Sequence, residues 1–336
     1  MPFNAELLKL VREQREKTQT EFAEALDIKQ ALISKFERGV VVPTDEMVKK
    51  IAECTNYPAS FFSQQISVGL NGLVYHRKRT SLSAAKRSAI EAEGKLRALE
   101  AKAVCEKLGR GSDVLTRHER TPEEMACAIR EYWQVPPRTI ENLVALLENH
   151  GIVILKFDFG TDLLDGFWVP LEADFKLICI ALNSNPAFSA DRQRFTLCHE
   201  LGHALLHEDK FPGKEAEQEA NRFAGEFLLP QRLVSDDLTP PISFSRLKEL
   251  KTKWKASMGS LLFRAKEIGK LKESNYRRMW SFLSEMGFRK WEPNCGIEFE
   301  TPTLLRQMFK EIGSDEDVCS LSHLNLSEFQ KRHSTL

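Results

Sequence analysis

The sequence predicts a mainly α-helical protein with a small β-sheet, that is, a protein of the α+β class. Apolar residues recur every three or four positions along most of the 336 residues, which is the spacing of amphipathic helices. Two short apolar runs rich in β-branched residues, IVILKFDF (152–159) and FKLICIAL (175–182), predict strands. The length suits two or three domains, and 42% apolar with 29% charged residues is an ordinary globular composition.

The composition also excludes several classes of protein. Lys and Arg number 48 and Asp and Glu number 48, so the chain as a whole has no uniform attraction to nucleic acid. No uncharged apolar run approaches the roughly 20 residues of a membrane span, and the N-terminus lacks the apolar core of a signal peptide. The seven cysteines are scattered without CxxC spacing, which indicates reduced thiols. We therefore expect a cytoplasmic protein with no membrane partner.

Residues 1–64 predict a domain of five short helices. Within it, the segment TQTEFAEALDIKQALISKFERG (18–39) has the form of a helix-turn-helix, and Thr18 can cap its first helix. Ile33 and Phe36 face inward on the second helix, so the opposite face of that helix is directed outward. A helix of this kind can lie in the major groove of DNA.

The outward face of the second helix carries side chains that suit DNA. Glutamine can read an adenine edge, and lysine can contact guanine or phosphate. The predicted DNA-binding residues are Thr18, Gln19, Lys29, Gln30, Ala31, Ser34 and Lys35. The alternative is a helical bundle for dimerisation or protein contact. Residues 1–64 carry nine Lys or Arg and ten Asp or Glu, which favours that alternative because phosphate neutralisation supplies most DNA affinity.

Residues 65–115 predict a basic helical linker. From 76 to 110 the chain has ten Lys or Arg and four Glu, and an Ala-rich run there predicts a helix. The positive balance of this segment would assist DNA binding by the preceding domain. Beyond the next domain, residues 237–336 predict a C-terminal region made of helices.

Residues 116–236 predict a domain that holds a metal site. Its segment RFTLCHELGHALLH (194–207) contains His199, Glu200 and His203 in HExxH spacing. On a helix, residues four apart differ by about 40° around the axis, so the two imidazoles can bind one Zn²⁺ ion. Glu200 lies about 100° away, where it can take a proton from the water that the metal activates. The alternatives are two surface histidines, or a buried pair that carbonyl groups satisfy.

A second amphipathic helix, KEAEQEANRFAGEFL (214–228), supplies the remaining metal-site residues. Glu217 can complete a His₂Glu ligand set, and Asn221, four residues later on the same face, can hydrogen-bond a ligand histidine. Glu219 is the rival third ligand, although it points about 160° away from Asn221. His207 lies four residues after His203, but the chain lacks the glycine turn of the HExxHxxGxxH pattern, so we expect no ligand role for it.

The N-terminal segment resembles the XRE/Cro-type helix-turn-helix family. The resemblance covers about 60 residues and depends on TQTEFA (18–23) and ISKFERG (33–39), followed by Pro43. It implies binding to operator DNA. Members of this family usually act as dimers, so the resemblance also implies a possible homodimer.

Residues 122–230 resemble the ImmA/IrrE family of HExxH metallopeptidases. The matching pieces are DGF (165–167), RFTLCHELGH (194–203) and EQEANRFAGEFLLP (217–230). The resemblance implies a zincin-like, gluzincin-type site with Glu217 as the third zinc ligand. Such domains are often fused to an XRE-type domain and are similar in role to regulators that cut a DNA-binding repressor.

Two functions therefore remain open. The first is a transcriptional regulator with a zinc-dependent endopeptidase domain, in which His199, His203 and Glu217 hold Zn²⁺ and Glu200 acts as general base on a repressor-type protein. The alternative is an XRE-family transcription factor or antitoxin whose peptidase-like domain is a non-catalytic sensor or dimerisation body. The complete ligand set with Glu200 favours the first function, because a non-catalytic site has no need of Glu200.

Overall fold

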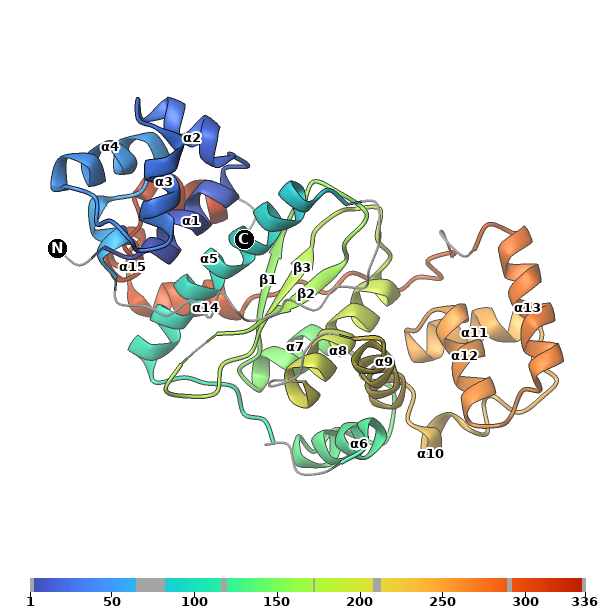
Figure 1. Ribbon diagram of the computed structural model, residues 1–336. Helices are drawn as coiled ribbons and strands as arrows, with labels where there is room; N and C mark the ends of the chain where they lie inside the picture. The colour runs from blue at the N-terminus through green and yellow to red at the C-terminus, as the bar shows by residue number, and fades with distance from the viewer. Residues whose placement is uncertain are drawn as a thin grey trace.

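The computed structural model describes residues 3–64, 82–115, 120–171, 173–207, 213–288 and 292–333. These residues form a mainly helical protein around a small three-stranded sheet, which confirms the predicted α+β class (Figure 1). Among the described residues, no helix has the length and apolarity that crossing a membrane requires.

The sheet is the central layer of the molecule. Strand β1 (Val153–Phe157) pairs in parallel with β3 (Cys179–Asn183), and β2 (Gly166–Val169) pairs antiparallel on the other side of β3. Strands β1 and β3 lie in the two predicted runs, whereas the four-residue β2 was not predicted. Alternate side chains enter two separate cores: Ile154 and Ile180 pack with one set of helices, and Val153 and Cys179 with the other.

The first core lies between the sheet and five helices, two of which precede the strands in the chain and three of which follow them. These are α6 (Pro122–Tyr132), α7 (Leu143–Asn149), α8 (Ala190–Leu206), α9 (Lys214–Leu228) and the short α10 (Gln231–Val234). Helix α8 packs against β2, β3 and α9, which places its central residues deep in the protein. The sequence explains the start of α6. Thr121 is its N-cap residue and forms a capping box with Glu124, and Pro122 is the first helical residue.

The N-terminal domain contains four α-helices and one 3₁₀ helix within residues 3–64. They are α1 (Ala5–Gln14), α2 (Gln19–Ala25), α3 (Gln30–Glu37), α4 (Asp45–Thr55) and the 3₁₀ helix η1 (Ala59–Ser63). Leu7, Phe22, Ile33 and Phe62 are completely buried in its core. Helix α2 starts at a capping box in which Thr18 accepts from the Glu21 N–H group and Glu21 accepts from Thr18.

Helix α5 (Ala84–Leu108) joins the N-terminal domain to the sheet. It contributes Ala92 and Leu96 to the core of the N-terminal domain, and Ala98 and Val104 to the core on the sheet. A Cβ atom at Gly94 would lie 2.6 Å from the ring of Phe167, so glycine is needed for this close contact. The predicted basic linker, residues 65–115, therefore contains an integral helix of the fold, while 65–81 lie outside the described residues.

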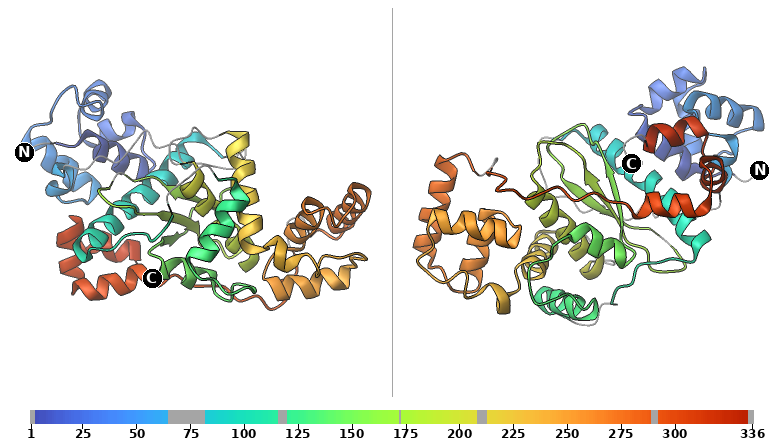
Figure 2. Two further views of the ribbon diagram at one scale, coloured as in Figure 1. Left: turned by 90° about the horizontal axis from the view of Figure 1, so that it is seen from below. Right: turned by 180° about the vertical axis from the view of Figure 1, so that it is seen from behind.

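The predicted C-terminal region divides into two groups of helices at opposite ends of the molecule (Figure 2). Helices α11 (Phe244–Trp254), α12 (Met258–Glu267) and α13 (Glu273–Glu285) extend the core beside α9 and α10. The chain then runs back as an extended segment over 292–303. Helices α14 (Leu304–Ile312), α15 (Asp315–Ser322) and α16 (Leu326–His333) finally pack against α5 and beside the N-terminal domain.

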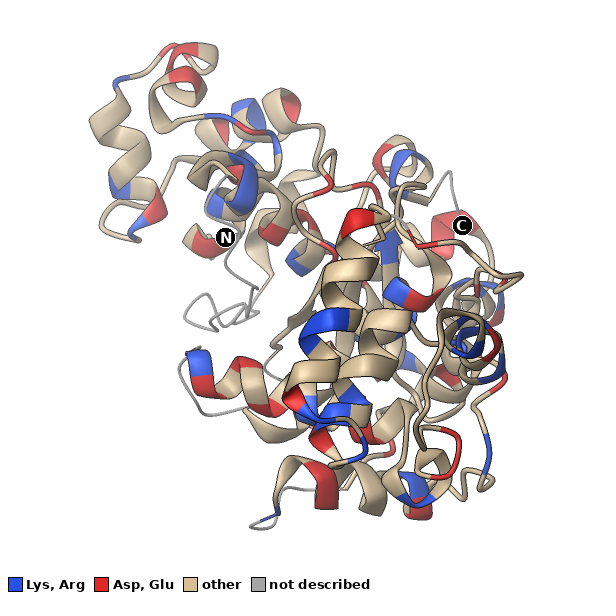
Figure 3. Ribbon diagram, turned by 90° about the vertical axis from the view of Figure 1, so that its right-hand side faces the viewer, with Lys and Arg blue, Asp and Glu red and all other residues tan. Residues whose placement is uncertain are grey.

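Buried ion pairs hold the extended segment in place. The ammonium group of Lys251, which is fully buried, lies 2.8 Å from Asp191 and 3.0 Å from Glu292. Farther along, Arg194 pairs with Glu300. These basic residues are thus paired with carboxylates inside the protein. Figure 3 shows basic and acidic residues interleaved over the helices.

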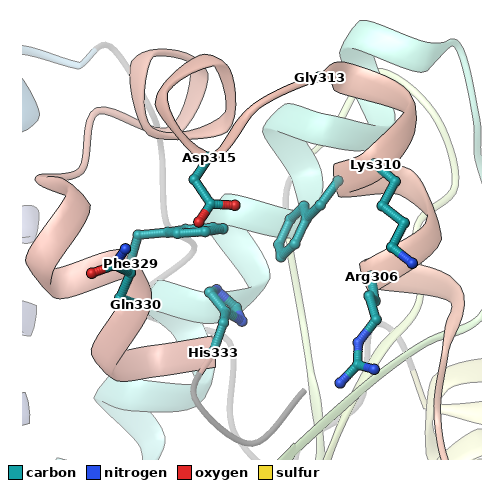
Figure 4. Close-up of a pocket in the computed structure, with 8 residues that line it drawn as sticks. Arg306, Lys310, Gly313, Asp315, Phe329, Gln330 and His333 are labelled. Carbon is teal, nitrogen blue, oxygen red and sulfur yellow. The ribbon is translucent and has the colours of Figure 1, made fainter.

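A cavity of about 390 Å³ lies among α14, α15 and α16 (Figure 4). Arg306 and Lys310 border it on one side, and Phe329 and His333 on the other. None of the predicted metal-site or DNA-binding residues lines this cavity.

Candidate metal centre and nucleic-acid interface

Helix α8 carries the HExxH residues at the buried face where it meets α9. His199 is 8% exposed and His203 is fully buried. The alternative of two surface histidines is therefore excluded. The His199 imidazole contacts the side-chain amide oxygen of Asn221, and the His203 imidazole contacts those of His199 and His207.

Three groups from the two helices converge on one point. The Nε2 atoms of His199 and His203 lie 3.0 Å apart, and the carboxylate of Glu217 lies 3.6 Å from His199 Nε2 and 3.4 Å from His203 Nε2. Ligand atoms about 2.0–2.1 Å from one tetrahedral zinc ion would lie about 3.3 Å from one another. The observed separations are close to this value, so the three groups could hold a metal ion.

The partners of the outer ring nitrogens also fit a metal. Asn221 on α9 turns its Oδ1 atom to His199 Nδ1 at 3.2 Å. Because an amide oxygen only accepts, Nδ1 of His199 carries the proton and Nε2 presents a lone pair to the other two groups. A neutral His199 in this tautomer is the form that binds a metal. The contact predicted between Asn221 and a ligand histidine is thus present.

His207 and Glu219 lie behind His203 and not at the convergence point. The Nδ1 atom of fully buried His207 is 3.0 Å from His203 Nδ1, and its Nε2 atom is 2.8 Å from Glu219 Oε2. The rival assignment of Glu219 as a ligand is not supported by this geometry. The contact of His207 with His203 was not predicted from the sequence. The recurrence of histidine at 199, 203 and 207 was the available signal.

The electrostatics of the centre follow from burial and from the neighbouring charges. Burial raises the pKa of Glu200 well above its ordinary value, and the Glu217 carboxylate adds to this rise, while the Trp168 N–H group opposes it. Burial lowers the pKa of His203 to about 4. Burial acts to raise the pKa of Glu217, but the adjacent imidazoles of His199 and His203 outweigh it and hold that pKa far below its usual range.

Glu200 is held by the edge strand of the sheet. The backbone N–H group of Trp168 in β2 donates to Glu200 Oε2 at 2.8 Å, and Glu200 is only 5% exposed. The carboxylate therefore has one oxygen fixed, and the Glu217 carboxylate is near enough to influence its charge. Sequence reasoning missed Trp168, because the contact uses a backbone group and depends on the pairing of β2.

The candidate nucleic-acid interface is formed by α2 and α3. Gln30 donates through Nε2 to Gln19 Oε1 at 2.7 Å, and Gln19 donates in turn to Glu37 at 2.8 Å. Arg12 pairs with the same Glu37. The two predicted DNA-binding glutamines are thus fixed relative to each other, which orients the first turn of α3.

Most of the predicted DNA-binding residues are exposed within the part of the chain that the structure describes. The exposed ones are Thr18, Lys29, Gln30, Ala31 and Lys35, while Gln19 and Ser34 are partly buried. Helices α14–α16 contact the opposite part of the N-terminal domain, where Arg15 pairs with Glu328 at 2.8 Å and Asn56 accepts from Asn325. They leave the outer face of α3 uncovered. Thr18 also serves as the cap of α2.

Comparisons with known families agree with the two resemblances. A helix-turn-helix family model matches residues 8–62, and the IrrE N-terminal-like domain of the peptidase M78 family matches residues 147–266. The second match includes α8 and α9 and continues to α12, past the predicted boundary at 236. No curated protein matches the chain. The chain thus combines an N-terminal helix-turn-helix domain of the XRE type with an IrrE N-terminal-like metallopeptidase-type domain.

Proposed function

We propose that the protein is a DNA-binding regulator whose IrrE-like domain is a zinc-dependent endopeptidase that cleaves a repressor-type protein. The observation that carries the proposal is the convergence of His199, His203 and Glu217, with ligand atoms within 4.8 Å of one another, next to Glu200. The helix-turn-helix domain supports the regulatory part, and the IrrE-like domain supports the peptidase part.

Zinc is the metal that suits this set of donors. Two imidazole nitrogens and one carboxylate are the ligands of many catalytic zinc sites, which leave a further position open. A bound zinc ion would activate water and polarise the carbonyl group of the peptide bond to be cleaved. In our proposal His199, His203 and Glu217 hold the ion, and Asn221 orients His199 through its Nδ1 proton.

Glu200 acts as the general base and then as the general acid. Its carboxylate accepts a proton from the attacking water and returns that proton to the leaving amine. The Trp168 N–H group, 2.8 Å from Oε2, fixes one carboxylate oxygen and leaves the other for proton transfer.

The DNA-binding part of the proposal rests on the outer face of α3. Lys29 and Lys35 would contact phosphates or guanine, and Gln30 would read an adenine edge in operator DNA. Ala31 and Ser34 share this face and allow close approach to the bases, while Thr18 and Gln19 stand at the first turn of α2. A homodimer would place two such helices on successive turns of DNA.

Substitution of Glu200 by Gln tests the peptidase mechanism. Glu200→Gln should keep one zinc ion per chain and lose proteolysis by about 10²–10⁴-fold, because only the proton-transfer group is removed. Zinc is measured by elemental analysis, and cleavage by mass spectrometry after incubation of the zinc-loaded protein with candidate repressors. His203→Ala is the matched ligand variant and should lose stoichiometric zinc.

The outcomes separate the proposal from its alternative. Retained cleavage in Glu200→Gln would remove Glu200 from the mechanism. A wild-type protein that binds zinc and operator DNA but cleaves no repressor would support the alternative of a non-catalytic sensor or dimerisation body. A wild-type protein without stoichiometric zinc would refute the metal site itself.

A further inference from the structure

We propose that His207 and Glu219 are positioning residues that fix the tautomer of His203. In this arrangement the proton of His203 stays on Nδ1, so that Nε2 always presents its lone pair to the metal. The inference rests on the proposed function, since it assumes that His203 binds the metal. It assigns a role to two side chains that the proposed function does not use.

The geometry forms a continuous chain of three side chains. His203 Nδ1 lies 3.0 Å from His207 Nδ1, and His207 Nε2 lies 2.8 Å from Glu219 Oε2. His203 and His207 are both fully buried, so water does not compete for these contacts. Helix α8 ends at Leu206, and His207 is its C-cap residue with φ −128° and ψ 23°. This change of direction at the helix end lets His207 lie between His203 and α9.

The Glu219 carboxylate determines which ring nitrogens of His207 and His203 carry a proton. Glu219 accepts, so Nε2 of His207 carries a proton and donates it. In neutral His207 the Nδ1 atom then has a lone pair and accepts from His203 Nδ1–H. His203 is thereby left with a lone pair on Nε2, the atom that lies 3.0 Å from His199 Nε2 and 3.4 Å from Glu217.

In this proposal, the two ligand histidines are oriented by different hydrogen-bond acceptors, which both lie on α9. His199 has an amide acceptor, Asn221, in direct contact. His203 has a carboxylate acceptor that acts through a second imidazole. Both acceptors come from α9, which also carries Glu217. Such partners behind a ligand histidine usually change metal affinity by about 10–100-fold.

Metal affinity of three variants tests the proposal. His207→Phe fills the same space without an acceptor and should weaken zinc binding by about 10–100-fold. His207→Asn keeps an acceptor, because its Oδ1 atom stands close to the place of Nδ1, and should recover most of the affinity. Glu219→Met should weaken binding less than His207→Phe. Glu215→Gln, an exposed site on α9, is the control and should match the wild type. Zinc affinity is measured by competition with a chelator.

A measurement without metal reports the tautomer directly. In ¹⁵N-histidine spectra of the zinc-free protein, His203 should be protonated at Nδ1 in the wild type and in His207→Asn. In His207→Phe it should become a mixture of the two tautomers. A purely structural role of His207 would not produce this pattern, because packing does not depend on the acceptor.

The outcomes distinguish this inference from the proposed function. Equal zinc affinity in His207→Phe and wild type would overturn the inference, as would equal losses in His207→Phe and His207→Asn. A wild-type protein that binds no zinc would instead refute the metal site, while the spectra of the zinc-free protein would still test the tautomer of His203.

Discussion

The close packing of α8 and α9 at the candidate metal centre depends on Gly202. It lies between Glu200 and His203 in the sequence, on the side of α8 that faces α9. A Cβ atom there would lie 3.1 Å from the Phe223 ring and 3.3 Å from the Ala220 Cα atom. These contacts are tighter than ordinary packing, so a larger residue would push the two helices apart. Two proposed ligands are on one helix and the third is on the other.

Gly202→Val should therefore lower both stability and zinc affinity. We expect a loss of about 1–3 kcal/mol in the free energy of unfolding, as for other overpacked core positions, measured by denaturant titration. Zinc affinity should fall because Glu217 moves away from the two imidazoles. Gly225→Ala on α9, whose added Cβ would have its nearest neighbour at 4.0 Å, is the control and should be neutral or slightly stabilising. Unchanged zinc affinity in Gly202→Val would show that the helix spacing is not critical.

Part of the candidate metal centre could be predicted from sequence, because helical spacing places each pair of its residues on one face of a helix. His199 and His203 share a face of any helix, and Glu217 and Asn221 share a face of the next. The role of His207 could not be predicted in this way. Helical spacing puts His207 on the face of His203, but the contact between the two Nδ1 atoms depends on where α8 ends, which local patterns do not specify. The contact of Trp168 with Glu200 likewise depends on strand pairing, which local patterns do not specify.

Helix α5 shows how one element connects the two domains. On it, Glu93 lies 2.6 Å from Arg97, 2.9 Å from Gln14 of α1 and 3.9 Å from Arg332 of α16. Burial acts to raise the pKa of Glu93, but the charges of Arg332 and Arg97 outweigh it and lower the pKa from 4.5 to about 2. The ionised carboxylate is thus preferred more strongly in the folded protein than in the unfolded chain.

This shift predicts a stability contribution that depends on pH. A group with a lowered folded pKa stabilises above its unfolded value, here 4.5, and the contribution is lost as pH falls towards about 2. Glu93→Gln should cost on the order of 2–3 kcal/mol at pH 7, and the difference from wild type should shrink between about pH 5 and pH 2. Denaturant titrations at several pH values measure this. Glu316→Gln, on the exposed face of α15, is the control. A difference that does not change with pH would contradict the assignment.

The sequence could not predict the position of α5, although it predicted a helix there. Its polar and apolar residues do not segregate on two faces, because different parts of its circumference pack against the N-terminal domain, the sheet and α14–α15. A helix that is covered on several sides shows no clear stripe. Its Ala-rich, basic composition therefore suggested a linker, although Lys95 and Arg97 are buried.

At the scale of the whole molecule, the last helices, α14–α16, contact both the N-terminal domain and α5. Arg332 of α16 contacts Tyr57, and His333 lies 2.8 Å from Glu100 of α5. Leu324 joins the apolar core of the N-terminal domain together with Ala92 and Leu96 of α5. Removal of residues 1–64 would uncover this apolar surface, so the role of the domain is better tested with surface variants of the full chain.

Under the proposed function, we expect the helix-turn-helix domain to bring the peptidase-type domain to a repressor bound at an operator. Attachment to the same DNA would raise the effective concentration of the peptidase near its substrate. The double variant Gln30→Ala with Lys35→Ala changes only exposed residues of α3. It should weaken operator binding by about 10–100-fold, because base and phosphate contacts are lost.

Cleavage of the repressor should then respond to DNA in a specific way. On a fragment that carries the operator, the double variant should cleave more slowly than the wild type, whereas both should cleave free repressor at the same rate. Lys50→Ala, a change at a half-exposed position of α4, is the matched control and should behave as wild type in both assays. Time courses followed by mass spectrometry give the rates. Equal rates of wild type and double variant on operator DNA would show that the domain does not deliver the peptidase, and slower cleavage of free repressor would show that α3 contacts the repressor itself.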